Sequence, residues 1–298
     1  MFVVSVIAQA GILDGMLVEN IRNTCGGGVV NWLAPGEAAE FPLTTAPDDF
    51  ETVWKSCQAL EVDLILQRGE RQRKKLLLAD MDSTMIAQEC IDELADVAGV
   101  GNAVKAITRR AMNGEFNFSE ALLERVALLA GQPEAIIDEV ISERITFVAG
   151  GNVLLATMKA HGAYAALVSG GFTVFSKKVA AHFGFDEQRA NQLLIENGVL
   201  TGGVADPILG KEAKVLALEE LITKLSITEA EVIAVGDGAN DLGMLRRAGT
   251  GVALYAKPAV AAQCDIQINF GDLSALLYLQ GYSKNTFINP LECTNLAL

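Results

Sequence analysis

The sequence is poor in basic residues. Its 298 residues contain 23 Lys and Arg against 37 Asp and Glu, which gives a formal net charge of -14. Non-specific nucleic-acid binding depends on clustered Lys and Arg, so this balance argues against DNA or RNA as a partner. The one basic cluster runs from Arg68 to Lys75. Because the apolar run Leu76–Ala79 follows it directly, we interpret the cluster as a solvated linker.

Long apolar runs are also missing, and none approaches the roughly 18 residues that a membrane span needs. We therefore expect no membrane partner. Residues 1–10 are apolar, but no positive residue precedes them and Asp14 follows quickly, so they are predicted to form a β-strand instead of a signal peptide. The five cysteines are scattered without a C-x-x-C motif, which is typical of free thiols in a reducing cytoplasm.

Histidine is nearly absent. The only two, His161 and His182, lie in ordinary helix-like surroundings, and we interpret both as structural. A zinc site or a Ser-His-Asp triad is therefore difficult to assemble from this chain.

Residues 1–70 show the order strand, helix, strand, strand, helix, strand. The helices are expected to begin near Ile12 and Pro47, and three glycines, Gly26 to Gly28, end the first of them. This βαββαβ order is typical of a ferredoxin-like domain, whose helices cover one sheet face. The other face must find a partner, so this domain is expected to pack against another part of the chain or to form a homodimer.

From Lys75 to about residue 280 the pattern is that of a doubly wound α/β domain. Short apolar strands end in Asp, Ser or Gly and are followed by helices, as in Leu76–Ala79, 163–168 and 232–235. Residues 85–151 are strongly helical and form an inserted cap, while Asn197-Gly198 predicts a hairpin. The tail, residues 281–298, is expected to be poorly ordered. Because ligands bind at the carboxyl ends of parallel strands, the polar strand ends should converge on one site.

The first strand end, Asp80-Met81-Asp82-Ser83-Thr84, carries two carboxylates at positions i and i+2, which face the same way in an extended segment. One Asp could attack phosphorus to form an aspartyl phosphate, and the other could protonate the leaving oxygen and then activate water. For that second role its pKa should be raised by the neighbouring carboxylates. Taken alone, a D-x-D segment is more often just a turn or a helix N-cap.

Two further strand ends fit the same chemistry. The segment Gly236-Asp237-Gly238-Ala239-Asn240-Asp241 supplies hard oxygen ligands that suit Mg²⁺. A bound cation would also offset the electrostatic repulsion between the clustered carboxylates and a phosphate dianion. Ser169-Gly170-Gly171 lets backbone N–H groups approach an anion. A lysine early in the helix near residue 211 could add a fixed positive charge, and spacing leaves Lys211 and Lys214 both open.

Together and in this order, these motifs resemble the four signature motifs of the haloacid dehalogenase superfamily. Within it, the stretch from about Lys75 to Leu279 resembles the phosphoserine phosphatase family, which hydrolyses O-phospho-L-serine in the last step of serine biosynthesis. The resemblance includes cap features around Glu89, Met112, Phe118 and Arg125. Residues 1–70 resemble, more distantly, the ACT-like regulatory domain of longer bacterial members.

The resemblance implies roles for individual residues. Asp80 would be the nucleophile and Asp82 the general acid and base. Mg²⁺ would be held by Asp80, Asp237 and the backbone carbonyl of Asp82. Asp241 would support the metal site, either through a water molecule or by contacting the residues that bind the metal. The remaining implied roles concern the substrate: phosphate would be bound by Ser169, Gly170, Lys214 and Asn240, and the serine part by Glu89, Met112, Phe118 and Arg125. Arg suits a carboxylate and Glu an ammonium.

Two alternative functions stay open from the sequence. The same motifs would serve a phosphotransferase that passes the phosphoryl group to another hydroxy amino acid such as homoserine. A protein that only binds an amino acid as a regulator, with a vestigial catalytic half, is a further possibility, against which the intact Asp80 and Asp82 argue.

Overall fold

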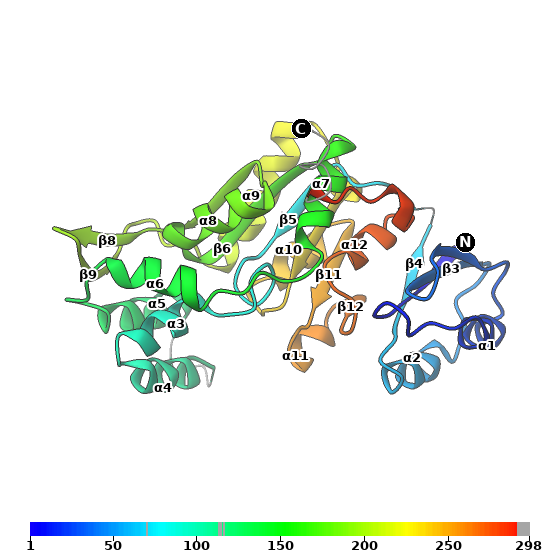
Figure 1. Cartoon of the computed structure of the whole chain (residues 1–298), viewed down its shortest axis with the longest axis horizontal. Coiled ribbons are helices and arrows are strands. Elements are labelled where there is room, and N and C mark those ends of the chain that lie inside the picture. Colours follow the sequence, from blue (N-terminus) through cyan, green and yellow to red (C-terminus); the bar gives the residue numbers. More distant parts are fainter. Residues whose placement is uncertain (70, 113–114, 116, 291–298) are drawn as a thin grey trace, which may run out of the picture. The chain divides into compact units, whose positions relative to one another are not determined.

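The computed structural model describes residues 1–290 apart from 70, 113–114 and 116 (Figure 1). The protein is of the α/β class, and the chain divides into two compact units. The first comprises Met1–Leu77, Ala149–Tyr164 and the stretch from Ser226 onward. The second comprises Leu78–Val148 and Ala165–Leu225. None of the helices in the described part of the chain combines the length and apolarity that crossing a bilayer requires.

The first unit begins with the expected ferredoxin-like module. Its elements follow the predicted order: β1 (Phe2–Ile7), α1 (Gly15–Cys25), β2 (Asn31–Ala34), β3 (Ala38–Leu43), α2 (Phe50–Gln58) and β4 (Asp63–Arg68). The strands form an antiparallel sheet in the order β2-β3-β1-β4. Val4 and Val6 of β1 alternate into a core that the two helices close, because side chains two apart on a strand share a face.

Helix α1 begins three residues later than the hydrophobic spacing predicts. The Asp14 carboxylate accepts a hydrogen bond from the Leu17 N–H at 2.7 Å, which makes Asp14 the N-cap and Gly15 the first helical residue. The helix ends as expected at the glycines, since Gly26 adopts a φ of 70° that other residues rarely tolerate. A capping side chain therefore outweighs apolar periodicity in setting the helix start.

The second face of this sheet is partly covered by other residues of the same unit. Ser5 and Ile7 on that face are fully buried. Arg71 donates hydrogen bonds to Ser5 and to the carbonyl of Tyr278, and its guanidinium pairs with Glu40 at 2.8 Å. The interpretation of this basic stretch as a solvated linker is therefore wrong for Arg71. Through these contacts its guanidinium holds the module against α12 (Ala275–Tyr278), a helix of the same unit.

The tail was expected to be poorly ordered, and residues 281–290 instead make defined contacts. Tyr282 is buried, Phe287 packs on Tyr278 with ring centroids 5.1 Å apart, and the Ile288 N–H donates to Thr157 Oγ1 at 2.8 Å. The short 3₁₀ turn η2 (Lys284–Thr286) carries Lys284, which pairs with Glu37 of the module. Residues 291–298 lie outside the described part of the chain.

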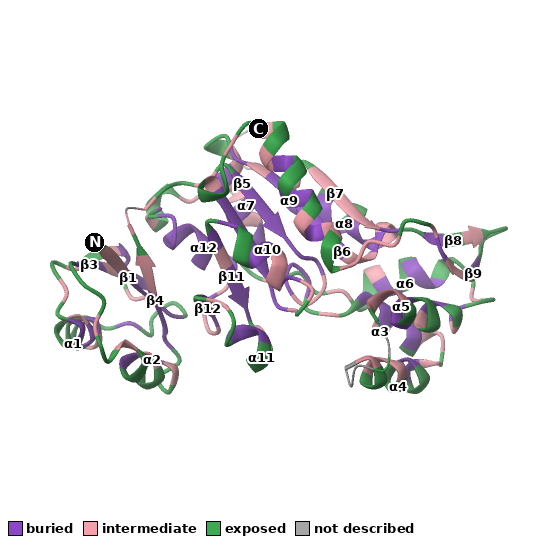
Figure 2. Cartoon of the chain, turned by 180° about the vertical axis from the view of Figure 1, so that it is seen from behind, coloured by how far each residue is buried: buried purple, intermediate pink, exposed green. Residues whose placement is uncertain are grey.

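A six-stranded sheet carries the strand ends named above. Its strand order is β12-β11-β10-β5-β6-β7. The strands are β5 (Leu76–Ala79), β6 (Tyr164–Phe172), β7 (Glu187–Asn191), β10 (Val232–Gly236), β11 (Thr250–Leu254) and β12 (Ile266–Ile268). All four residues of β5 and all five of β10 are buried, and β5 and β11 show largely as buried in Figure 2. Such continuous apolar runs are typical of strands covered on both faces.

Helices connect these strands. They are α7 (Gly151–Ala160), α8 (Thr173–Phe183), α9 (Lys211–Leu225), the 3₁₀ turn η1 (Glu229–Glu231), α10 (Leu242–Arg247), α11 (Pro258–Ala261) and α12 (Ala275–Tyr278). Four helices between β5 and α7 form the expected cap: α3 (Cys90–Val97), α4 (Gly101–Met112), α5 (Phe118–Ala127) and α6 (Ala135–Glu143). The hairpin joins β8 (Leu193–Glu196) to β9 (Val199–Val204) through Asn197 and Gly198, both at positive φ as a two-residue turn requires.

Candidate active site

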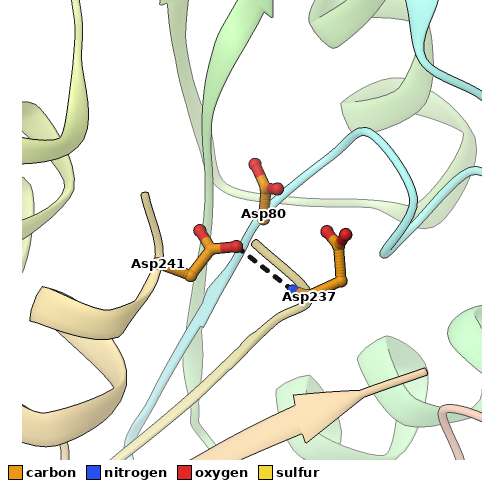
Figure 3. Close-up of side chains that lie close together, drawn as sticks. All are labelled: Asp80, Asp237 and Asp241. Atoms are coloured by element: carbon orange, nitrogen blue, oxygen red, sulfur yellow. Dashed lines mark hydrogen bonds between the residues drawn. The ribbon is translucent and has the colours of Figure 1, made fainter. Parts of the chain in front are cut away.

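Three carboxylates from strand ends lie together at the candidate site. Carboxylate oxygens of Asp80, Asp237 and Asp241 all lie within 4.8 Å of one another, and all three residues are buried (Figure 3). Oδ2 of Asp241 accepts hydrogen bonds from the N–H of Asp237 at 3.1 Å and of Gly238 at 2.9 Å, so this carboxylate is held in place. Buried like charges at this spacing repel strongly, and a divalent cation with oxygen ligands relieves that repulsion.

The cationic partner of Asp80 is Lys214. Lys214 lies in the first turn of α9, its side chain is 1% exposed, and its Nζ lies 2.6 Å from Asp80 Oδ1. Lys211 is exposed and pairs with the neighbouring Glu212 at 3.6 Å. Of the two lysines that spacing left open, Lys214 lies against Asp80 and Lys211 lies at the surface. The segment after Asp80 forms turns and α3 begins only at Cys90, so Asp80 is not a helix N-cap.

Asp82 occupies a setting suited to proton transfer. Its Oδ1 accepts a hydrogen bond from the Cys90 N–H at 3.1 Å, and its Oδ2 lies 3.4 Å from the Ser169 hydroxyl. Burial, followed by the negative charge of Glu89, raises the pKa of Asp82 to about 7, while the Cys90 hydrogen bonds and the charge of Lys214 oppose this. A carboxyl group with this pKa can both give and take a proton near neutrality.

The Ser169-Gly170-Gly171 segment closes β6 and is braced by a residue that the sequence analysis missed. The buried Asn191 side chain donates to the carbonyls of Gly170 at 2.8 Å and Leu209 at 3.2 Å, and it accepts from the Leu209 N–H at 2.7 Å. One amide thereby ties the Ser-Gly-Gly segment to the loop that leads into α9 and Lys214. Its only sequence signal is its place at the carboxyl end of an edge strand, β7.

Phe118 brings the cap against this segment. It is the first residue of α5, which Asn117 and Glu120 start with a reciprocal capping box. A Cβ placed on Gly170 would lie 2.9 Å from the Phe118 ring, and one placed on Gly210 would lie 3.3 Å from it. The ring therefore lies directly over both glycines. Phe118 was predicted to line the substrate pocket, and it contacts the predicted phosphate-binding backbone.

The remaining candidate residues are placed as follows. Glu89 is exposed and occupies the position before the first residue of α3 without a side-chain capping bond, and its Oε1 accepts a hydrogen bond from the Ser83 hydroxyl at 3.0 Å. Arg125 is half-buried in α5; burial lowers the pKa of its guanidinium, and the charges of Asp92, Glu89 and Asp82 act against that. The Asn240 side chain lies over Gly238. Met112 ends α4, and its side chain lies outside the described residues.

We predict that Gly171→Ala lowers kcat by about 10²-fold, the typical cost of displacing a catalytic group by about 1 Å. An added Cβ would lie 2.5 Å from Asp82 Oδ2, so the carboxylate must move. Steady-state kinetics checks this, with Gly15→Ala as control because nothing lies within 4 Å of its Cβ position. Unchanged kcat in Gly171→Ala would show that the position of Asp82 is not critical.

The model of the haloacid dehalogenase-like hydrolase family matches residues 77–246, which include all three clustered aspartates and Lys214. The chain belongs to this family.

The curated relatives compared here carry one activity in their names. A phosphoserine phosphatase of Haemophilus influenzae is 45% identical over 204 residues, which cover 68% of this chain and 65% of the relative. One from Albidiferax ferrireducens is 46% identical over 210 residues, or 69% of this chain and 89% of the relative. The chain thus spans slightly less than two thirds of the H. influenzae protein and most of the A. ferrireducens one.

Solved structures agree in fold. A HAD family hydrolase from Salmonella enterica matches with a TM-score of 0.85 and 29% identity, covering 93% of this chain and 97% of that one. A phosphoserine phosphatase solved as a phospho-aspartyl intermediate analogue matches with a TM-score of 0.64 and 40% identity, over 70% of this chain and 99% of that one.

Proposed function

We propose that the chain hydrolyses O-phospho-L-serine to L-serine and phosphate, the last step of serine biosynthesis, through an aspartyl-phosphate intermediate. The observation that carries the proposal is the ion pair of Asp80 with the buried Lys214, next to a second aspartate, Asp82, whose pKa is about 7. A nucleophile, a fixed cation and an acid-base group are the three parts that the reaction needs. The names of the relatives supply the substrate.

In the first step an Asp80 oxygen attacks phosphorus, and the bond from phosphorus to the serine oxygen breaks. The leaving oxygen takes the proton of neutral Asp82. Lys214, Ser169 and the N–H groups of the Ser-Gly-Gly segment stabilise the charge on the phosphoryl oxygens. A solved relative bearing an analogue of the phospho-aspartyl intermediate supports this route.

In the second step Asp82, now ionised, takes a proton from water as the water oxygen attacks phosphorus. The bond between phosphorus and the Asp80 oxygen breaks, which releases phosphate and restores both carboxyl groups to their starting states. Phe118, packed over Gly170, limits the access of bulk water while serine is present. Because Asp82 gives a proton in one step and takes one in the next, its raised pKa serves both.

The three clustered aspartates fit Mg²⁺, since their oxygens lie close enough to share one ion and are hard ligands. Asp80, Asp237 and the backbone carbonyl of Asp82 would hold the ion, while Asp241, fixed by two backbone N–H groups, supports the site. The ion would supply positive charge beside the phosphoryl oxygens.

A substrate panel tests the proposed activity. Phosphate release is measured with Mg²⁺ for phosphoserine, phosphothreonine, phosphohomoserine and simple sugar phosphates, and phosphoserine is expected to give the highest kcat/KM. Repeating the assay with homoserine as an added acceptor separates hydrolysis from phosphotransfer, because transfer yields phosphohomoserine in place of free phosphate. A preference for a sugar phosphate would refute the substrate assignment.

Removal of the metal is expected to abolish phosphate release reversibly. Chelation by EDTA takes away the charge that lets the aspartate cluster accept a phosphate dianion. Activity is measured before EDTA, after it, and after excess Mg²⁺ is restored. An EDTA-insensitive rate contradicts the metal assignment.

Arg125→Ala is expected to lower kcat/KM for phosphoserine by about 10²-fold, which corresponds to losing one charge-assisted contact of about 3 kcal/mol. The same variant should lose much less with phosphoethanolamine, which has the ammonium but not the carboxylate. Arg125 is half-buried, and it lies close enough to Glu89 and Asp82 for their charges to act on its pKa. This is the setting expected of an arginine that binds the carboxylate of an amino-acid substrate. Equal losses on both substrates would show that Arg125 does not read the carboxylate.

Residues 1–70 are proposed to be an ACT-like regulatory module, and the whole chain to act in the cytoplasm. The ferredoxin-like strand order supports the first proposal. A homodimer through this module is also proposed, and it would use surface other than the part of the sheet that Arg71 contacts.

A further inference from the structure

The N-terminal module holds one loop of the first unit with a buried carboxylate. Asp63, the first residue of β4, is fully buried. Its Oδ1 accepts a hydrogen bond from the Asn269 N–H at 2.8 Å, and its Oδ2 accepts from the N–H groups of Phe270 at 3.1 Å and Gly271 at 2.8 Å. Consecutive N–H groups that share one carboxylate form an anion-binding arrangement, and such charge-assisted bonds are stronger than neutral ones. The carboxylate therefore fixes residues 269–271.

Two further bonds hold the same loop, which leaves β12 at the carboxyl edge of the six-stranded sheet. The Asn269 side chain donates to Gln58 Oε1 of α2 at 2.7 Å. The Tyr255 hydroxyl, just after β11, donates to the Gly271 carbonyl at 2.7 Å. β11 lies next to β10, whose end carries Asp237 of the candidate active site. The loop is thus shared between the module and the strand ends on which the site is built.

The continuation of this loop contacts the residues at which the chain leaves the cap. The Leu273 N–H donates to the Ala149 carbonyl at 3.1 Å. Gly150 has a φ of 79°, and a Cβ placed on it would lie 2.5 Å from both Asp272 Oδ1 and the Ser274 backbone nitrogen. Asp272 Oδ1 also accepts from the N–H of Ser274 at 2.8 Å and from its hydroxyl at 2.6 Å. Residues 272–274 therefore lie directly against Ala149 and Gly150 and are themselves held in one arrangement.

Residues 144–150 form the returning linker of the cap, and they pair with the outgoing one. The Ala87 N–H donates to the Thr146 carbonyl and the Val148 N–H to the Met85 carbonyl, each at 2.9 Å. The outgoing linker begins directly after Asp82. Backbone and hydrogen bonds together therefore connect the module, through residues 269–274, to the base of the cap.

We propose that Asp63 is a positioning residue for the cap, and that the N-terminal module takes part in the phosphatase reaction through it. This inference rests on the proposed function. Phe118 packs over Gly170, so the cap has to move for substrate to enter, and its linkers have to bend. A fixed base leaves the cap fewer arrangements, which reduces the conformational entropy that substrate binding must remove. Asp63 acts through residues 269–274 and the linker, and not on the substrate.

Hydrogen exchange followed by mass spectrometry tests this coupling on the full chain without substrate. Asp63→Asn keeps the size of the side chain but replaces one acceptor oxygen by an NH₂ group, which faces an N–H donor. Exchange in residues 269–271 should then be faster, as any local loss of hydrogen bonds predicts. The proposal also requires exchange that is faster by about tenfold at the hydrogen-bonded amides of residues 146–154.

Two variants accompany this measurement. Asn269→Ala removes only the bond to Gln58, so a change of about threefold in the same direction is expected in residues 146–154. Glu37→Ala is the matched control, because Glu37 also joins the module to the rest of its unit. Its partners are the Tyr278 hydroxyl at 2.7 Å and Lys284, and both lie outside residues 269–274. Glu37→Ala should therefore leave exchange in residues 146–154 unchanged.

Kinetics with phosphoserine give the second readout. In Asp63→Asn the KM is expected to rise about tenfold with kcat within about twofold, because a smaller fraction of the protein has its cap poised for binding while Asp80 and Asp82 are unaltered. A purely structural role would reduce the amount of folded enzyme, and so lower the apparent kcat at constant KM. Glu37→Ala should keep both constants.

Two exchange results would overturn the proposal: an unchanged rate in residues 146–154 of Asp63→Asn, and an equal acceleration there in Glu37→Ala. A lower kcat at unchanged KM would overturn it as well. Asn269→Ala decides the question if Asp63→Asn does not fold, since it leaves the Asp63 carboxylate in place. A native chain that fails to hydrolyse phosphoserine refutes the proposed function alone, and the exchange measurements still decide whether Asp63 holds the linker.

Discussion

Replacing Asp80 by Asn is expected to lower kcat by at least about 10³-fold, because an amide of the same shape cannot act as the attacking nucleophile. The fold should survive. Asp80 is buried beside Lys214, and Asn keeps an acceptor oxygen for the Lys214 ammonium while removing one of three clustered negative charges. The loss should therefore lie in chemistry, and circular dichroism should match the native chain.

Trapping the intermediate gives this prediction a second readout. The native chain is mixed with phosphoserine and Mg²⁺, quenched in acid and examined by peptide mass spectrometry, and phosphate is expected on Asp80 only. Asp80→Asn should carry none. Asp138→Asn, at an exposed position of α6, is the matched control and should behave as the native chain. Phosphate on another residue would refute the assignment of Asp80 as the nucleophile, and substantial turnover by Asp80→Asn would falsify the covalent route through it.

The parts of the fold that sequence patterns predict are those governed by local rules. The strand over Leu76–Ala79 and the hairpin at Asn197-Gly198 occur at the predicted residues, since an apolar run and a turn dipeptide act within a few positions. The strand ends that carry Asp80 and Asp237 also bring the two carboxylates together, as the topology of parallel sheets requires. Local pattern and fold class together were enough for this part of the site.

Other parts depend on contacts between distant segments, which no local pattern encodes. Arg71 looks like one member of an exposed basic run, yet its side chain is only 10% exposed, because it contacts Ser5, Glu40 and the Tyr278 carbonyl. Asn191 likewise has no motif of its own, although it braces both the Ser-Gly-Gly segment and the loop before Lys214. For these residues the partners decide the role, and the partners become visible only in three dimensions.

Replacing Lys214 by Met is expected to reduce both activity and stability. The fixed charge beside the phosphoryl group is lost, which should lower kcat/KM by about 10²- to 10³-fold. The side chain is 1% exposed, so Met fills its space but leaves the Asp80 carboxylate without its ammonium at 2.6 Å. Removing one partner of a buried ion pair costs about 3–5 kcal/mol. Denaturant unfolding in EDTA measures this free energy without interference from bound metal.

A double-mutant cycle separates the two effects. In Asp80→Asn with Lys214→Met the uncompensated carboxylate is gone, so the free energy of unfolding should return most of the way to that of Asp80→Asn alone, while activity stays absent. Lys211→Met, which removes an exposed lysine of the same helix, should leave stability within about 0.5 kcal/mol and activity unchanged. If the two single losses of stability simply add, then Lys214 and Asp80 are not energetically coupled, and the buried ion pair on which the mechanism depends is not formed in solution.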